Sequence, residues 1–338
     1  MHRLRSIALA AQPSLPYLRR LIGLALIVVL AWQLWYHGDL AAWWPTLLAA
    51  WQQPGAAGWL LAAVLLMPLN WALETIKWRG LLRVYWPAGW STAFRAVMAG
   101  VGVSLATPNR IGEYGGRLLV VPAEQMGAVV WTTLVGSLCQ WLVFLLLGWP
   151  ALIGLLAEPL HMTWRLAVPL AVSLPLVALA IPLLWDFLMR GLETSRWGDR
   201  WPRWRWVRRQ WLFRQRVRGE HLRKALWWAT LRFLVYTLQY YLLLRFFGLP
   251  IGWWEGLAGI SAIYLVQAGL PLPPGLGVFT RTELAIWLWG GTTVHPAGIL
   301  AATVTLFLIN LALPALLGAG LIVKTRESKT LKYANENS

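Results

Sequence analysis

The sequence predicts an all-α, polytopic integral membrane protein, a helical bundle, because its apolar segments are long, uncharged and repeated along the chain. Of the 338 residues, 58% are hydrophobic and only 13% are charged, whereas about a quarter of the residues in a soluble domain are charged. Charged side chains are absent from 40–73, 125–157, 166–185 and 256–280. About 20 apolar residues are enough for a helix to cross the hydrocarbon core, so the chain can cross several times.

The 26 tryptophans are consistent with the same fold class. Many lie near the predicted ends of spans, and indole rings favour the headgroup level of a bilayer. The alternative explanation is a lineage habit of using Trp, and it leaves the membrane prediction unchanged. The single cysteine, Cys139, cannot form an internal disulfide.

Basic residues are concentrated in a few connections, and this predicts the orientation of the chain. The segment 190–224 contains twelve Lys or Arg against three acidic residues, whereas the connections near 37–58, 148–164 and 248–254 contain no Lys or Arg. Basic loops stay in the cytoplasm. We therefore expect both termini and the basic loop 190–224 on the cytoplasmic side of a bacterial-type inner (plasma) membrane.

This orientation predicts six full crossings and two one-sided segments within a single domain, 1–338. The one-sided segments are 90–123, which begins and ends inside, and 254–290, which begins and ends outside. A further apolar helix is expected over 40–53, in the outer interface. The six crossings are expected at about 21–36, 57–76, 125–147, 165–188, 225–247 and 297–323.

Within the basic loop, tryptophans alternate with arginines over 197–216. Basic residues beside aromatic ones are also typical of nucleic-acid binding. On a loop flanked by spans, we instead predict binding to anionic lipid headgroups. We expect membrane lipids, and no nucleic acid, as partners.

The two one-sided segments contain the most informative motifs. They read SLATPNRIGEYGGR over 104–117 and AGLPLPPGLGVFTRTE over 268–283. Each begins as an apolar helix, breaks at prolines, reaches an aliphatic–glycine pair and then presents charge. The pattern Pro-x-x-Ile-Gly at 108–112 aligns with Pro-x-x-Leu-Gly at 273–277, a short match that gains weight from its placement.

We interpret these segments as the broken or re-entrant helices of an inverted-repeat transporter. The approximate halves 57–150 and 225–323 have the same order of span, broken segment and span in opposite orientation. Interruptions at corresponding places in two halves indicate a transporter binding site, and broken backbone at membrane depth is stable only inside protein or beside a watery cavity. The alternative is that both segments are ordinary, solvated surface loops.

This interpretation predicts a polar, arginine-lined cavity that binds a lipid headgroup. Arginine can grip phosphate with two parallel hydrogen bonds, glycine permits close approach of the backbone, and helix N-termini offer N–H groups to anions. Glu113 is the expected counter-charge of the arginines. The predicted substrate-binding residues are Arg110, Gly112, Glu113, Arg117, Gly275, Gly277, Arg281 and Glu283.

Polar side chains within the predicted spans are a second set of candidates, for the cavity or for ion coupling. Asn70, Glu74 and Lys77 share one helical face, and ionisable groups within spans are functional candidates by default. Arg232 is a candidate in a later span. The alternative for Lys77 is that it snorkels to the interface and pairs with Glu74, and Asn310 is more typical of a helix–helix contact than of a ligand.

These motifs resemble the lysylphosphatidylglycerol synthase transmembrane family, also called the flippase-like membrane domain family. The resemblance implies a role in moving a lipid or lipid-linked precursor between leaflets. It rests on Asn70, Glu74 and Lys77-Trp78, on the run 107–113 with Arg117, and on the run 273–278.

The sequence departs from the family pattern in two ways. About fifteen residues follow the last predicted span, so we expect a stand-alone member without a synthase domain. The resemblance also leads us to expect an acidic residue nearer Val278 than Glu283, so the role of Glu283 is left open.

The sequence therefore predicts a transporter or flippase for an anionic phospholipid or lipid-linked phosphate. It contains no Walker motif, so ATP does not bind by that route, and ion coupling through Glu74 or Glu113 is one predicted energy source. We expect no catalytic residue, metal or cofactor. One alternative is a membrane enzyme acting on a lipid phosphate, with Glu113 and His161 or His295. Another is a scaffold for envelope-biosynthesis enzymes that docks them on 197–216.

Overall fold

The structure, a computed structural model, describes the chain from residue 40 to residue 324 with six gaps. The gaps are the single residues 106, 271 and 273 and the stretches 108–110, 195–215 and 291–295. The predicted crossing 21–36 lies outside the described residues, as does most of the basic loop. Within the described residues, all regular structure is helical, which confirms the all-α class.

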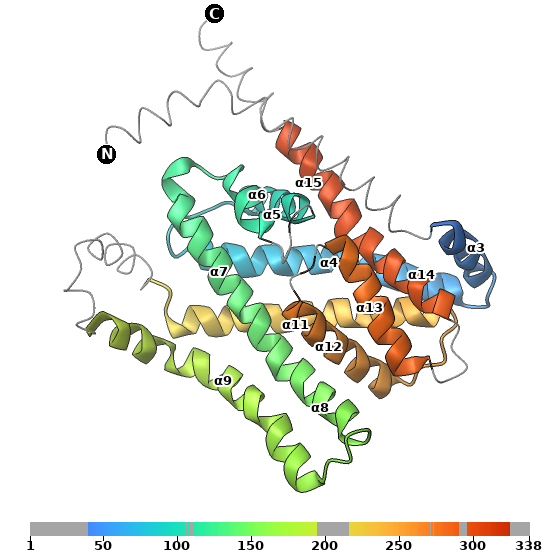
Figure 1. Ribbon diagram of the computed structural model, residues 1–338. Helices are drawn as coiled ribbons and strands as arrows, with labels where there is room; N and C mark the ends of the chain where they lie inside the picture. The colour runs from blue at the N-terminus through green and yellow to red at the C-terminus, as the bar shows by residue number, and fades with distance from the viewer. Residues whose placement is uncertain are drawn as a thin grey trace, which may run out of the picture.

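The helices follow the predicted segments closely (Figure 1). In chain order they are α3 Leu40–Trp51, α4 Ala56–Leu82, α5 Trp90–Ser104, α6 Gly112–Leu118, η2 Ala123–Gln125, α7 Met126–Val143, η3 Phe144–Gly148, α8 Trp149–Ala157, α9 Trp164–Thr194, α11 Gly219–Phe246, α12 Trp253–Gly269, α13 Pro274–Trp289, α14 Pro296–Phe307, η5 Leu308–Ala312 and α15 Leu313–Lys324.

Four helical stretches have the length and apolar composition needed to cross a membrane. They are Ala56–Leu82, Ala123–Ala157, Trp164–Arg190 and Pro296–Gly318, and they correspond to four of the predicted crossings. The helix α11 has 28 residues, which is long enough for a fifth crossing, but its first turns are charged. The full set of six crossings and the inverted repeat stay predictions.

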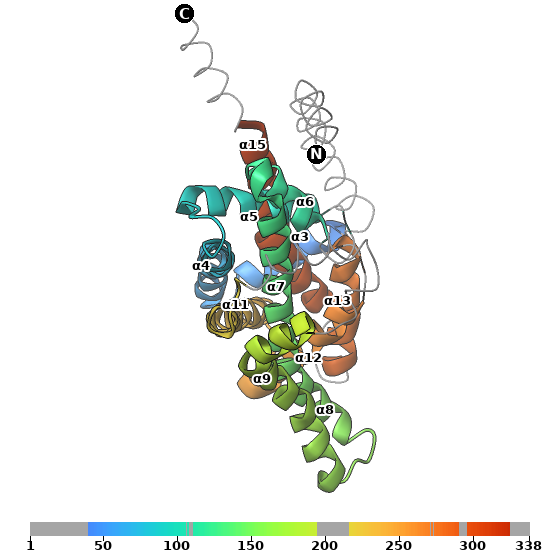
Figure 2. The ribbon, with the colours of Figure 1, turned by 90° about the vertical axis from the view of Figure 1, so that its left-hand side faces the viewer.

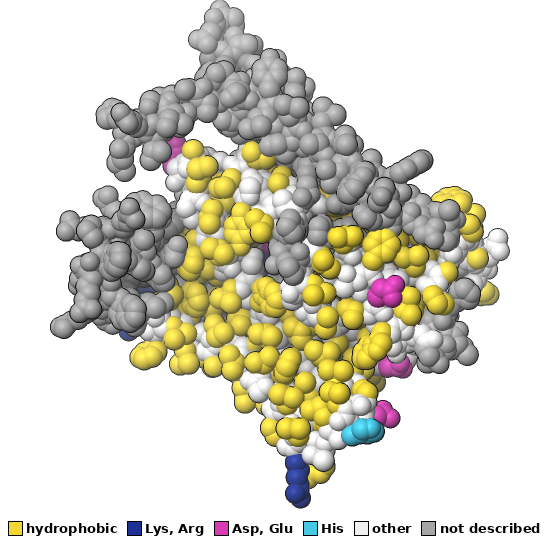
Figure 3. Space-filling model, in the orientation of Figure 1, with side chains coloured by type: hydrophobic (Ala, Val, Ile, Leu, Met, Phe, Trp, Pro, Cys, Tyr) yellow, Lys and Arg dark blue, Asp and Glu magenta, His cyan; other side chains and the backbone are white. Residues whose placement is uncertain are grey.

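The outer surface of α9 is apolar along most of its length. Leu176, Leu183 and Phe187 are 61%, 70% and 73% exposed, and Figure 3 shows hydrophobic side chains covering this part of the molecule. Helices α8 and α9 extend together beyond the remaining helices (Figures 1 and 2). Soluble monomers rarely expose an apolar surface of this extent, so this face is suited to lipid.

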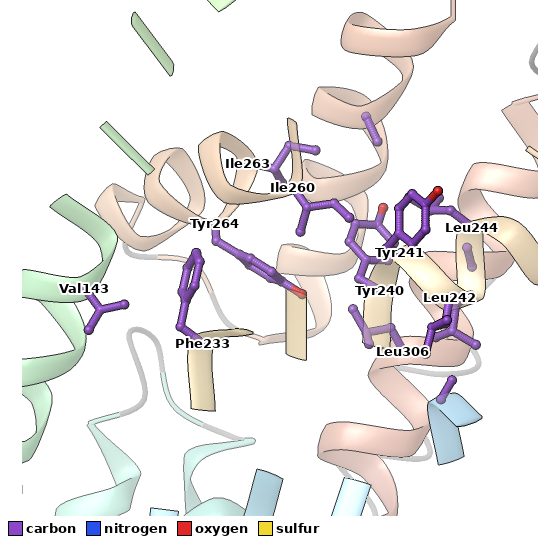
Figure 4. Close-up of a cluster of buried hydrophobic side chains, with 14 of the residues drawn as sticks. Val143, Phe233, Tyr240, Tyr241, Leu242, Leu244, Ile260, Ile263, Tyr264 and Leu306 are labelled. Carbon is purple, nitrogen blue, oxygen red and sulfur yellow. The ribbon is translucent and has the colours of Figure 1, made fainter. Parts of the chain in front are cut away.

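The antiparallel pair of α4 and α11 has the most extensive contact among the described helices (Figure 1). Near the start of α4, the Ala63 carbonyl accepts a hydrogen bond of 2.8 Å from Gln239 Nε2, near the end of α11. Buried side chains of α11 pack with those of α7, α12 and α14 in one continuous core. Figure 4 shows the aromatic part of this core, with Tyr264 between Phe233 and Tyr240. Within lipid, such close packing holds helices together.

Both one-sided segments are pairs of helices that pack against each other, α5 with α6 and α12 with α13. The break between α5 and α6 falls at the predicted proline. On its far side, the Gly112 N–H donates a hydrogen bond of 2.7 Å to Thr107 Oγ1, which satisfies one of the unpaired donors at a helix start. The break between α12 and α13 also falls among prolines, after extended backbone at Leu270.

Glycine sets the distance between α5 and α6. A Cβ atom added at Gly112 would collide with the backbone of Val103, and one added at Gly116 would collide with the backbone of Ala99. A Cβ at the neighbouring Gly115 would meet nothing within 4 Å. The two helices therefore approach closely because glycine faces the contact. Arg117, near the end of α6, reaches Glu74 on α4 with its side chain.

Candidate functional site

Glu74 is the centre of a buried charge cluster drawn from three helices. Its carboxylate lies 2.6 Å from Lys77 Nζ on α4, 2.9 Å from Arg117 Nη2 on α6 and 3.0 Å from Arg232 Nη1 on α11. The side chains of Glu74, Lys77 and Arg117 are 9%, 3% and 2% exposed. Lys77 thus pairs with Glu74 within one turn, but it is buried and does not extend to a solvated interface.

A second carboxylate, Glu113, contributes to the same cluster. Its Oε2 lies 3.1 Å from Arg117 Nη2, one turn apart on α6. Arg117 also donates to Thr133 Oγ1 at 3.4 Å, and its guanidinium stacks 4.9 Å from the ring centre of Trp78. The cluster contains three cations and two carboxylates, so these five groups have one positive charge in excess.

A chain of amide side chains extends from this cluster along the α4–α11 pair. Arg232 Nε donates to Asn70 Oδ1 at 2.9 Å, and Asn70 Nδ2 donates to Asn310 Oδ1 at 3.3 Å. Asn310 Nδ2 in turn donates to Gln239 Oε1 at 2.7 Å. Asn310 lies in the π-helical turn η5, and it joins α4 to α11 as a helix–helix contact. Arg232 is further held by Gln140, at 3.3 Å.

Arg281, on α13, has a different environment. Its Nε and Nη2 donate to Gln267 Oε1 at 3.2 and 2.8 Å, and Gln267 Nε2 donates to the Gly277 carbonyl at 2.8 Å. The guanidinium lies 5.2 Å from the ring centre of Tyr264 and 5.9 Å from that of Tyr240. Among the described residues, no carboxylate pairs with this half-buried cation.

Aromatic side chains connect the two cationic centres. The Arg232 guanidinium lies 5.9 Å from the ring centre of Tyr236, and Tyr236 meets Tyr264 edge to face, with ring centres 4.8 Å apart. Tyr264 is the ring against which Arg281 packs. Cations bind favourably to such rings, so a series of aromatic contacts links the surroundings of Arg232 to those of Arg281.

The two broken segments contribute to one apolar cluster. Leu105, at the end of α5, and Val278, in the first turns of α13, belong to one buried cluster with Phe307. Arg117 and Arg281 have separate partners. The described contacts therefore form two cationic centres, and a single cavity lined by both arginines stays a prediction.

The remaining candidate residues have less polar contact or lie outside the described residues. Glu283 is exposed on α13, and Gly112 is buried against α5. Gly275 lies in the first turn of α13. Arg110 lies outside the described residues.

Sequence reasoning missed two glutamines of the network, Gln140 and Gln267. Each lies in a long stretch without charge and accepts a hydrogen bond from an arginine. A lone amide in an otherwise apolar span costs free energy unless it finds a partner. A single amide side chain within a long apolar stretch was therefore the sequence signal that could have identified both glutamines.

The comparisons with known proteins agree with the helical architecture. The model of the family described as "Lysylphosphatidylglycerol synthase TM region" matches residues 20–318. No curated protein matches the chain. The family match covers most of the sequence, including both broken segments and all four apolar stretches long enough to cross a membrane. The chain therefore belongs to the lysylphosphatidylglycerol synthase TM region family and is a multi-pass, lipid-related membrane protein of the flippase-like kind.

Proposed function

We propose that this protein moves an anionic phospholipid or a lipid-linked phosphate between the two leaflets of the membrane. The observation that carries this proposal is the buried cluster around Glu74, in which three cations from three helices face two carboxylates. Ionisable groups inside a membrane protein are costly and mark substrate or ion pathways. An excess of positive charge there is complementary to a phosphate group.

The cluster can lower the main barrier to lipid transfer. A headgroup crosses hydrocarbon slowly because its polar and charged groups lose their water. Arginine side chains replace that water with directed hydrogen bonds, and Glu74 holds the cations in place when no phosphate is bound. The acyl chains remain in the bilayer throughout, so only the headgroup needs a polar path.

Arg281 is suited to be a second binding site for the phosphate headgroup. Its guanidinium is held by an amide and two rings, so a phosphate does not have to displace a carboxylate from it. Aromatic rings lie between Arg232 and Arg281. The guanidinium of either arginine can therefore shift toward the other and stay in contact with an aromatic ring. The headgroup then passes between the Glu74 cluster and Arg281.

Two further observations support an inverted repeat of 57–150 and 225–323. Each proposed half contains a helical pair broken at prolines, α5–α6 in the first and α12–α13 in the second. The span after each pair contains a π-helical turn, η3 in the first half and η5 in the second. π-helical turns are rare and occur frequently at functional sites, so their corresponding placement favours the repeat.

The test is transport of a fluorescent lipid in proteoliposomes. Labelled phosphatidylglycerol is placed in both leaflets, and a membrane-impermeant reductant reports how fast lipid from the inner leaflet reaches the outer one. We expect wild-type protein to transport the lipid, and Arg281→Gln to slow it by about tenfold, because a hydrogen bond to a charged group contributes about 1.5–3 kcal/mol.

The matched control is Arg245→Gln. Arg245 is also a half-buried arginine beside an aromatic ring, Trp59 at 5.9 Å, but it lies on α11 outside both centres. Equal rates for Arg281→Gln and Arg245→Gln, or no wild-type transport of any anionic lipid offered, would contradict the proposal. Headgroup release in the same liposomes is the corresponding assay for the enzyme alternative.

A further inference from the structure

A separate pocket opens between α4 and α11, at the end of the pair that is joined to the basic loop. Its volume is about 190 Å³. On α11 it is lined by positions 221, 224, 225 and 228, which lie on one helical face by their spacing. The facing wall is the last two turns of α4, from Ile76 to Arg83. The pocket therefore lies between the start of α11 and the end of α4.

The charge of this pocket is strongly positive. Its wall includes Lys77, Arg79, Arg83, Lys224 and His221, and among the described residues no Asp or Glu lines it. Two carboxylates lie close to lining residues without lining the pocket themselves, since Glu74 pairs with Lys77 and Glu220 lies 3.8 Å from His221. Arg83 and Lys224 are exposed, so their charges face the opening.

The pocket also has an apolar side. Ile76, Leu81 and Trp228 contribute to its wall, next to the cationic groups. A soluble anion needs only the charged part of such a site. A phospholipid presents a phosphate followed by a glycerol backbone and acyl chains, so it matches both parts. Basic pockets between membrane helices bind anionic lipid headgroups in this way.

We propose that this pocket binds the phosphate headgroup of an anionic phospholipid from the leaflet on the side of the basic loop. Arg79, Arg83 and Lys224 hold the phosphate, and Trp228 packs against the glycerol region. Lys77 is shared with the buried cluster, because it lines the pocket and its Nζ lies 2.6 Å from Glu74. The side chain of Lys77 then lies between a bound phosphate and Glu74.

This site goes beyond the proposed transport and does not depend on it. A lipid can be held here whether or not the protein moves lipids across the membrane. The reverse also holds, since transport through the Glu74 cluster does not require a stable lipid at the entrance. An assay of binding alone therefore tests the pocket without testing transport.

The experiment is native mass spectrometry of the purified full chain, delipidated in detergent and titrated with defined lipids. The variant Arg83→Gln/Lys224→Gln removes two exposed cations of the pocket and leaves the buried cluster intact. We expect it to bind the first phosphatidylglycerol at least about tenfold more weakly than wild type, since each basic residue near an anionic lipid contributes about 1 kcal/mol. Phosphatidylcholine binding is expected to be equally weak in both proteins.

The matched control is Arg190→Gln/Arg223→Gln. These two arginines are also exposed, lie near the same end of α9 and α11, and do not line the pocket. Equal loss of lipid affinity in the two double variants would show general attraction to a basic surface and overturn the assignment. Glycerol phosphate is the soluble competitor, and if it binds as tightly as the lipid, the assignment to a lipid is wrong.

Discussion

The two broken segments of this protein share a sequence pattern, yet their arginines have opposite surroundings. Arg117 is 2% exposed, and its guanidinium contacts two carboxylates. Arg281 is half-buried and contacts one amide and two aromatic rings. The first arginine is paired with carboxylates between helices, whereas the second has no carboxylate partner among the described residues. Similar motifs thus present an arginine paired with two carboxylates in the first segment and an arginine held by an amide in the second.

The largest expected effect is that of Glu74→Gln. This substitution leaves Lys77, Arg117 and Arg232 buried with one counter-charge fewer, and an unpaired buried charge costs about 3–5 kcal/mol. We expect the purified protein to lose a large part of its thermal stability or to aggregate, measured by fluorescence-detected size exclusion after heating. Wild-type stability of Glu74→Gln would mean that water reaches these cations.

The variants Arg117→Gln and Arg281→Gln test the difference between the surroundings of the two arginines. Removing Arg117 leaves Glu74 and Glu113 without their shared partner, so we expect a loss of about 2–3 kcal/mol in stability. Removing Arg281 takes two donors from Gln267 but leaves no described carboxylate unpaired, so we expect a smaller loss of about 1–1.5 kcal/mol. Thermal melts of the two variants in the same detergent measure the difference. Similar losses would show that the two arginines are equivalent.

Close approach within the first segment is tested by Gly116→Ala. The added methyl group collides with the Ala99 backbone, so α5 and α6 must move apart, at a cost of about 1–3 kcal/mol. Gly115→Ala is the control, because a Cβ there meets nothing within 4 Å. The ratio of their melting shifts is the measurement, and equal shifts would contradict the packing of α5 on α6.

The smallest expected effect is that of Asn310→Ala. It removes the amide that joins Asn70 to Gln239, and hydrogen bonds between membrane helices contribute about 0.6 kcal/mol on average. We expect a shift of the unfolding midpoint that is small and distinct from zero, with lipid transport retained. Loss of transport at wild-type stability would instead place Asn310 in the substrate path.

Much of the fold was predictable from the sequence, because long apolar runs specify helices in lipid and prolines specify where they break. The predicted crossing 57–76 is found within α4, and the predicted helix 40–53 is found as α3. The Glu74–Lys77 pair also followed from spacing, since the two residues are three positions apart on one helix. Each of these predictions depends on residues that are neighbours along the chain.

The rest of the candidate site depends on residues that are distant along the chain. Arg117 reaches Glu74 across 43 positions, and Arg232 reaches Asn70 across 162. No spacing rule connects such pairs, because the rotation of each helix about its axis is set by packing against the others.

The sequence by itself determined a helical membrane protein with two proline-broken segments and a small set of buried ionisable residues. Only the tertiary structure decided which cation meets which carboxylate, and that Arg281 meets an amide instead. The physical reason is that helix formation in lipid is satisfied within each segment, whereas the pairing of side chains depends on how closely neighbouring helices approach. Here that approach is set by glycines such as Gly116, where α6 packs directly on the backbone of α5.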